Sequence, residues 1–152
     1  MGLLDAIRGS RVYLDANVWI YALEQFPSYS QPLADLFTSV QTGSLVIVTS
    51  ELSLSEILVR PIAVGDTDKQ EIYTQSIVRT KNVVAAPVER SILIGAAKIR
   101  AETKLKLPDA IHAATAIATS CTTFLTNDKQ FRTVRSINTV LLAQAVLEPD
   151  SD

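Results

Sequence analysis

Four acidic side chains lie where predicted strands end or within predicted helices. They are Asp15, Glu56, Asp109 and Asp128. Asp15 and Asp128 follow short apolar runs typical of strands, whereas Glu56 and Asp109 lie in segments with helical spacing. In parallel α/β sheets, ligands bind just beyond the C-terminal ends of the strands. The four carboxylates can therefore meet at one edge of such a sheet.

Each acid also has an ordinary structural explanation when it is taken alone. Asp15 can cap a helix, and Asp128 can belong to an Asn–Asp turn. Glu56 can be a solvated helix residue, and Asp109, directly after Pro108, is a favourable charge in a first helical turn. The neighbours of Glu56 and Asp109 are apolar, however, and a buried carboxylate is costly unless a cation pairs with it.

Carboxylates that converge repel one another, so a cluster of them predicts a bound metal ion. The chain has only one His and one Cys. Oxygen ligands without a set of His or Cys residues favour Mg²⁺ or Mn²⁺ over zinc. The formal net charge of −2 argues against passive coating of nucleic acid, but an acidic protein can act on phosphates when a metal supplies the positive charge.

The composition indicates one domain. The 152 residues are 47% hydrophobic and 20% charged, which predicts a single domain over 1–152, with its core at about 11–142 and a flexible tail over 148–152. No apolar run approaches the roughly 18 residues that cross a bilayer, and the N-terminus lacks the basic region of a secretory signal. The single Cys121 excludes an internal disulfide and fits a cytoplasmic location.

Apolar residues alternate between the periods of strands and helices. Strands are predicted over 12–14, 45–49, 82–87, 123–126 and 137–141. Helices are predicted over 18–25, 30–42, 50–60, 67–79, 89–103 and 107–120, with a short turn or helix over 128–131. Ser30 and Ser50 are expected as caps, and Pro61 as the end of the third helix. The alternation predicts an α/β domain with a mainly parallel sheet.

Four segments around the acids carry a family resemblance. They are YLDANVWIY at 13–21, SELSLSEILVRP at 50–61, PDAIHAATA at 108–116 and LTND at 125–128. In chain order they resemble the acidic motifs of PIN domains, most closely those of VapC-type toxins from prokaryotic toxin–antitoxin systems. The likeness covers nearly the whole chain, from about Val12 to Leu142.

The resemblance implies a PIN-like α/β/α fold and a metal-dependent endoribonuclease using Mg²⁺ or Mn²⁺. Asp15, Glu56, Asp109 and Asp128 would be its catalytic and metal-binding residues. Asn17, Thr126 and Asn127 would be supporting polar groups, by position. The resemblance also implies a homodimer, a cognate antitoxin that occupies the active-site groove, and a tRNA or rRNA loop as a target.

The chemistry of such a site follows from its residues. A metal held by Asp15, Glu56 and Asp109 would polarise a phosphodiester oxygen and lower the pKa of a bound water for in-line attack. A second ion near Asp128 would stabilise the leaving oxygen, and the sequence leaves open whether one ion or two bind. His112 lies one helical turn beyond Asp109, where it could orient that carboxylate or assist substrate binding. A structural role, or one that supports the ligands, is favoured, because residues three apart on a helix are close by geometry alone.

Cations near the acids are candidates for contacts to the RNA backbone. They are Arg60, Lys129 and Arg132, together with Arg135, Lys104 and Lys106. The alternative for each is a solvated surface charge.

Two other functions compete with nuclease activity. One is a PIN-like module that binds RNA or a partner and has lost catalysis. The other is a phosphatase, because Asp15 after a strand resembles the nucleophile of haloacid-dehalogenase-like enzymes. That pattern requires a second Asp two residues later, where this chain has Asn17.

Overall fold

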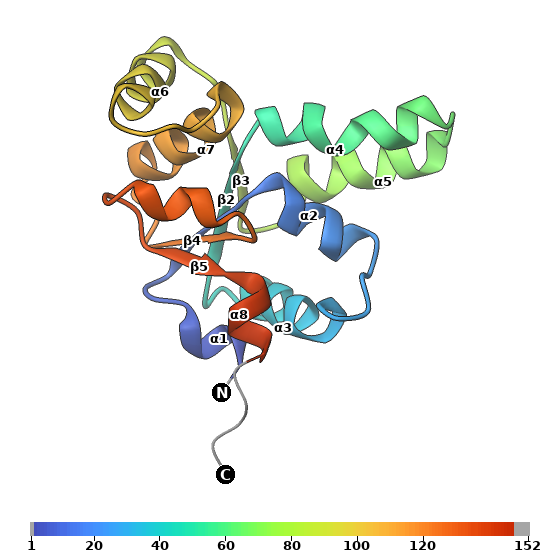
Figure 1. Cartoon of the computed structure of the whole chain (residues 1–152). Coiled ribbons are helices and arrows are strands. Elements are labelled where there is room, and N and C mark those ends of the chain that lie inside the picture. The colour runs from blue at the N-terminus through green and yellow to red at the C-terminus, as the bar shows by residue number, and fades with distance from the viewer. Residues whose placement is uncertain (1, 148–152) are drawn as a thin grey trace.

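A computed structural model describes residues 2–147 and contains one five-stranded sheet (Figure 1). The strands are β1 (Arg11–Leu14), β2 (Val46–Ser50), β3 (Val83–Ala86), β4 (Thr123–Thr126) and β5 (Thr139–Leu141). Their order is β3-β2-β1-β4-β5, and every neighbouring pair is parallel. The predicted α/β class is confirmed. The predicted tail, 148–152, lies outside the described residues.

Helices cover both faces of the sheet. They are α1 (Leu3–Ala6), α2 (Ala16–Leu23), α3 (Ser30–Gln41), α4 (Leu52–Ala63), α5 (Thr67–Val78), α6 (Arg90–Glu102), α7 (Leu107–Ala118), the 3₁₀ helix η1 (Lys129–Thr133) and α8 (Leu142–Leu147). Side chains of α6, α7 and η1 form the core on one face, and those of α1, α2, α3, α4, α5 and α8 form the core on the other (Figure 1). The expected α/β/α layering is confirmed. No helix in the described range is long and apolar enough to cross a membrane.

Alternate residues of β1 face the two cores. Val12 and Leu14 pack with α2 and α3, whereas Tyr13 packs with α6 and α7. This alternation follows from the pleat, because successive side chains of a strand point to opposite faces. It places Tyr13 against α7, the helix that carries Asp109.

Three local predictions about helix ends need correction. Helix α4 continues through Pro61 to Ala63, because Pro61 lies in the last turn, where its missing N–H removes one hydrogen bond while the buried ring still packs. Ser30 is the first residue of α3, and the cap position is Tyr29. Ser50 ends β2, although its hydroxyl accepts the Leu52 N–H at 3.0 Å, as a cap would.

Candidate active site

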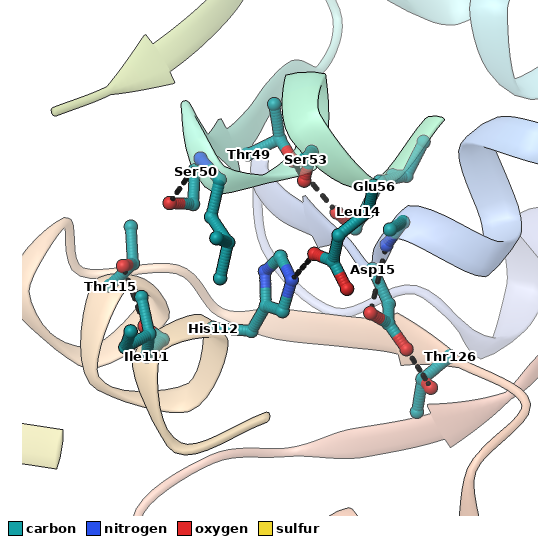
Figure 2. A network of polar contacts seen from close by, with 12 residues as sticks. Leu14, Asp15, Thr49, Ser50, Ser53, Glu56, Ile111, His112, Thr115 and Thr126 are labelled. Atoms are coloured by element: carbon teal, nitrogen blue, oxygen red, sulfur yellow. Dashed lines mark hydrogen bonds and ion pairs between the residues drawn. The ribbon is translucent and has the colours of Figure 1, made fainter. Parts of the chain in front are cut away.

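Asp15 ends β1 and caps α2 at the C-terminal edge of the sheet. Its side chain is 5% exposed. Oδ1 accepts the Ala16 N–H at 2.8 Å, and Oδ2 accepts the Thr126 hydroxyl at 2.7 Å (Figure 2). Burial raises the pKa of this carboxyl, the charge of Glu56 adds to the rise, and His112 and the two hydrogen bonds oppose it. Both of its oxygens are therefore held, at some electrostatic cost.

Glu56 projects from α4 toward the same edge, and its side chain is 34% exposed. Its Oε1 lies 2.5 Å from Nε2 of His112, which is fully buried on α7. Nδ1 of His112 lies 2.6 Å from the Tyr13 hydroxyl. His112 thus contacts Glu56 and Tyr13, and within residues 2–147 no hydrogen bond joins it to Asp109. Figure 2 shows the Glu56 carboxylate between the imidazole and Asp15.

Asp109 lies in the first turn of α7, where it is half-buried. Burial is the main cause of the raised pKa of its carboxyl, followed by the negative charges of Asp15 and Asp128. Glu56 raises it further, and only His112 lowers it. The negative charges of the other three acids therefore all act on Asp109 at the start of α7.

Asp128 follows β4 and caps η1 by accepting the Gln130 N–H at 2.9 Å. Its own N–H donates to the Thr126 hydroxyl at 3.0 Å. Thr126 therefore bridges Asp15 and the backbone of Asp128, in agreement with its predicted supporting place. Asp128 therefore has the ordinary capping role, and its place among the metal-binding acids stays a prediction.

The other two predicted supporting residues lie apart from the carboxylates. The Asn127 side chain accepts the Ala143 N–H at 2.8 Å and donates to the Tyr29 hydroxyl at 3.4 Å, so it joins β4 to α8 and to the start of α3. Asn17 is exposed in the first turn of α2. Neither has a hydrogen bond to an acid of the cluster within residues 2–147, so their predicted role remains a prediction from the motif.

The sequence profile of the PIN domain matches residues 12–137. This chain belongs to the PIN domain family. The matched range contains all four acids and every strand except β5, apart from Arg11 at the start of β1. No curated protein matches the PIN domain described here in sequence.

Solved structures share the fold of this PIN domain. A toxin–antitoxin complex from Klebsiella pneumoniae is 25% identical, with a TM-score of 0.63, covering 85% of this chain and 95% of that one. VapC20 from Mycobacterium tuberculosis, a sarcin–ricin loop cleaving toxin, is 15% identical, with a TM-score of 0.65 and coverage of 81% and 94%. VapBC2 from Rickettsia felis, bound to a promoter DNA fragment, is 20% identical, with a TM-score of 0.61 and coverage of 86% and 98%. The resemblance to VapC-type PIN toxins is confirmed at the level of the fold.

Two sets of hydrogen-bonded residues in the PIN domain site could not be predicted from local sequence patterns. One is the chain from Tyr13 through His112 to Glu56. The other is Thr49, fully buried, whose hydroxyl donates to the Leu14 carbonyl at 3.1 Å and lies 2.7 Å from the hydroxyl of Ser53. This second group ties the first turn of α4 to the end of β1. Its only signal in the sequence is the spacing of four residues between Thr49 and Ser53, which alone indicates nothing about the site.

The donor chemistry of the cluster suits a hard divalent cation. In the described part of the chain, no three His, Cys, Asp or Glu side chains are already gathered as a ligand set. Both nitrogens of His112 have partners, which leaves carboxylate oxygens as the donors. The charges of the other acids help to raise the pKa of Asp109, which reflects their repulsion of its carboxylate. A bound cation would relieve this repulsion. The residues therefore fit Mg²⁺ or Mn²⁺ better than zinc.

The predicted RNA-contacting cations lie on two elements, α4 and η1. Arg60 is exposed on α4, one turn beyond Glu56. Lys129 and Arg132 are exposed on η1, and Arg132 donates to the Gln144 side chain at 2.7 Å. A groove of about 560 Å³ runs between η1 and the segment before α7; it is lined by Glu102, Thr103, Lys104, Leu105, Lys106, Gln130 and Thr133.

Proposed function

We propose that this PIN domain is a metal-dependent endoribonuclease and the toxin of a toxin–antitoxin pair. The observation that carries the proposal is the PIN domain match over residues 12–137, a range that contains all four acids. The charges of Asp15, Asp128 and Glu56 all raise the pKa of Asp109. Such repulsion destabilises the apoprotein, and a bound cation would offset it.

In this proposal Asp15, Glu56, Asp109 and Asp128 hold Mg²⁺ or Mn²⁺ and carry catalysis. The ion would supply Lewis-acid stabilisation of the phosphodiester and a water activated for attack. Asp15 contributes a fixed, buried carboxylate, and Thr126 keeps it and Asp128 in register. Asn17 and Asn127 remain supporting groups on the strength of the motif alone.

The RNA backbone would enter along the groove between η1 and the start of α7. Lys104 and Lys106 line this groove. Both belong to the segment that leads into Asp109, so a phosphate bound there lies on the route to the carboxylates. Lys129 and Arg132 on η1 and Arg60 on α4 are the further candidates for phosphate contacts.

The proposed partners and substrate are inferred from the solved structures that share the fold. The neighbours from Klebsiella pneumoniae and Rickettsia felis are toxin–antitoxin assemblies, which supports a cognate antitoxin for this chain. VapC20 cleaves the sarcin–ricin loop, which supports structured RNA, such as a tRNA or rRNA loop, as the substrate class. A homodimer in the cytoplasm completes the proposal by analogy with the family.

The decisive experiment incubates the pure, antitoxin-free protein with total cellular RNA in Mg²⁺, in Mn²⁺ and in EDTA. Discrete cuts that require metal and disappear in Asp15→Asn and Asp109→Asn are expected, with a loss of at least about a thousandfold, because Lewis-acid stabilisation is worth several kcal/mol. The matched control is Asp68→Asn, which removes an exposed acid of α5 and should keep wild-type activity.

Other outcomes would identify a different function. Binding of RNA without cleavage in either metal would favour a catalytically silent PIN module. Hydrolysis of a small phosphomonoester through a phospho-aspartate at Asp15 would favour the phosphatase. Cleavage that survives in EDTA would contradict the proposed metal dependence.

A further inference from the structure

Glu56 has a single hydrogen-bond partner among the described residues, and that partner is His112. Asp15, in contrast, has a separate donor for each of its oxygens. A glutamate on a helix has three rotatable side-chain bonds, and one that is 34% exposed can turn toward water. Whatever orients the Glu56 carboxylate inside the site must therefore act through His112.

His112 is itself fixed from both sides. It is fully buried on α7, and its Nδ1 meets the Tyr13 hydroxyl at 2.6 Å. The Tyr13 ring is fully buried as well and stacks on Phe124, with ring centroids 4.9 Å apart and an interplanar angle of 10°. The imidazole thus rests on a tyrosine whose own ring is held in the core.

The Glu56 carboxylate can only accept hydrogen bonds, so Nε2–H of His112 is the donor to its Oε1. The second carboxylate oxygen has no hydrogen-bond partner among the described residues. Figure 2 shows this carboxylate lying toward Asp15. Histidines and carboxylates next to metal ligands commonly orient them in this way.

We propose that His112, backed by Tyr13, is a positioning residue that fixes the orientation in which the Glu56 carboxylate meets the divalent cation. The inference rests on the proposed metal-dependent function. It assigns His112 no contact with substrate or metal. Its role is to hold one oxygen of Glu56 so that the other oxygen faces the remaining acids. The Glu56 side chain is then already ordered, and it loses little conformational entropy when the cation binds.

The test compares Mn²⁺ affinity, measured by isothermal titration and by electron paramagnetic resonance, across three variants. His112→Leu removes the donor and should weaken Mn²⁺ binding by about 10- to 100-fold. His112→Gln places an amide N–H near the position of Nε2 and should restore affinity to within a few-fold. Tyr13→Phe keeps the ring stacked on Phe124, removes only the hydroxyl, and should weaken binding by a smaller factor.

The matched control is Thr115→Val, which alters another fully buried polar residue of α7 whose hydroxyl donates to the Ile111 carbonyl at 2.7 Å. It should lower the melting temperature without changing the Kd for Mn²⁺. RNA cleavage provides the second readout: kcat of the His112 and Tyr13 variants should fall at limiting Mn²⁺ and recover at saturating Mn²⁺, with KM for RNA unchanged.

The outcomes separate this inference from the proposed function. If the wild type binds Mn²⁺ and cleaves RNA, and folded His112→Leu and Tyr13→Phe bind Mn²⁺ as tightly as the wild type, the inference is wrong and the nuclease remains. If His112→Leu does not fold, Tyr13→Phe decides, because wild-type Mn²⁺ affinity in that folded variant would overturn the inference. If the wild type neither binds Mn²⁺ nor cleaves RNA, both proposals are overturned.

Discussion

Asp15 and Glu56 reach the same site from supports of opposite kinds. Asp15 is 5% exposed at the end of a central strand, and a backbone N–H and the Thr126 hydroxyl hold its two oxygens. Glu56 is 34% exposed on a helix, and within residues 2–147 its only hydrogen-bond partner is His112. An acid at a strand end inherits its position from the pairing of the sheet. An acid on a helix needs a side chain from another element to give it one.

The acids also differ in what disfavours their ionised forms. Burial is the main cause of the raised pKa of Asp15, so its ionised form is disfavoured by the fold itself. Asp109 combines burial with the charges of Asp15 and Asp128. Asp15 is thus held in place with its charged form disfavoured by burial. The other three acids are more exposed, so their side chains can move more easily. We expect variants on the fixed side to cost both stability and activity, and those on the helical side mainly activity.

Among the variants that test this comparison and leave the four acids in place, Thr126→Val, on the fixed side, should have the largest combined effect on stability and activity. The fully buried Thr126 hydroxyl donates to Asp15 and accepts the Asp128 N–H, so its loss disturbs two acids at once. The free energy of unfolding in urea should fall by about 1–3 kcal/mol, because buried polar groups lose their partner. Ribonuclease activity should fall by about 10- to 100-fold.

Thr123→Val is the matched control for this variant. Thr123 is 1% exposed at the other end of the same strand, and its hydroxyl donates to the Arg8 carbonyl at 2.8 Å. It should lose comparable stability and keep its activity. Full activity in Thr126→Val would mean that Asp15 is held by Ala16 alone and that the fixed side needs no hydroxyl.

A smaller effect, of opposite sign, is expected for the stability of Asp109→Asn. The native pKa of Asp109 is raised above that of the unfolded chain, about 3.9, so the native state binds the proton more tightly. The stability associated with this group is therefore fully present below the unfolded pKa and is lost as pH rises through the native pKa. Removing the charge should stabilise the apoprotein at neutral pH.

Urea unfolding in EDTA from pH 4 to pH 8 measures this gain. Asp109→Asn should exceed the wild type by up to about 1 kcal/mol at neutral pH, since the half-exposed group is screened by solvent, and the two should converge near pH 4. Excess Mg²⁺ should raise the free energy of unfolding of the wild type more than that of the inactive variant. A variant that is less stable than the wild type at neutral pH would show that Asp109 is not repelled in the apoprotein.

The sequence predicts the fixed side of the site better than the adjustable side. An apolar run followed by Asp15 defines both a strand end and a helix cap, and Pro108 before Asp109 defines a helix start; both are local signals. The partner of His112 is not local. Spacing of three residues along α7 indicates Asp109, whereas the rotation of α7 on the sheet turns the imidazole to Glu56, which lies on another helix.

Asn127 and the terminal helices show the same limit. Asn127 lies inside an acidic motif, yet its side chain bonds to the Ala143 N–H of α8. Helices α1 and α8, of four and six residues, are too short for a periodic pattern to indicate them. Local chemistry therefore predicts elements and their ends, while the side-chain partners across elements depend on packing angles that no single segment determines.

The smallest effect is expected from Ser53→Ala, which distinguishes two ways of placing Glu56. Ser53 is fully buried in the first turn of α4, and its hydroxyl lies 2.7 Å from that of Thr49, which is bonded to the Leu14 carbonyl. The variant should lower the free energy of unfolding by about 1 kcal/mol, the net worth of one hydrogen bond. If His112 orients Glu56, Mn²⁺ affinity and activity should stay within about threefold, because the link from α7 is intact. If the position of α4 on β1 sets Glu56 instead, Ser53→Ala should weaken Mn²⁺ binding as much as His112→Leu does. Titrating both variants side by side decides whether the helical acid is placed by its own helix or by the histidine opposite.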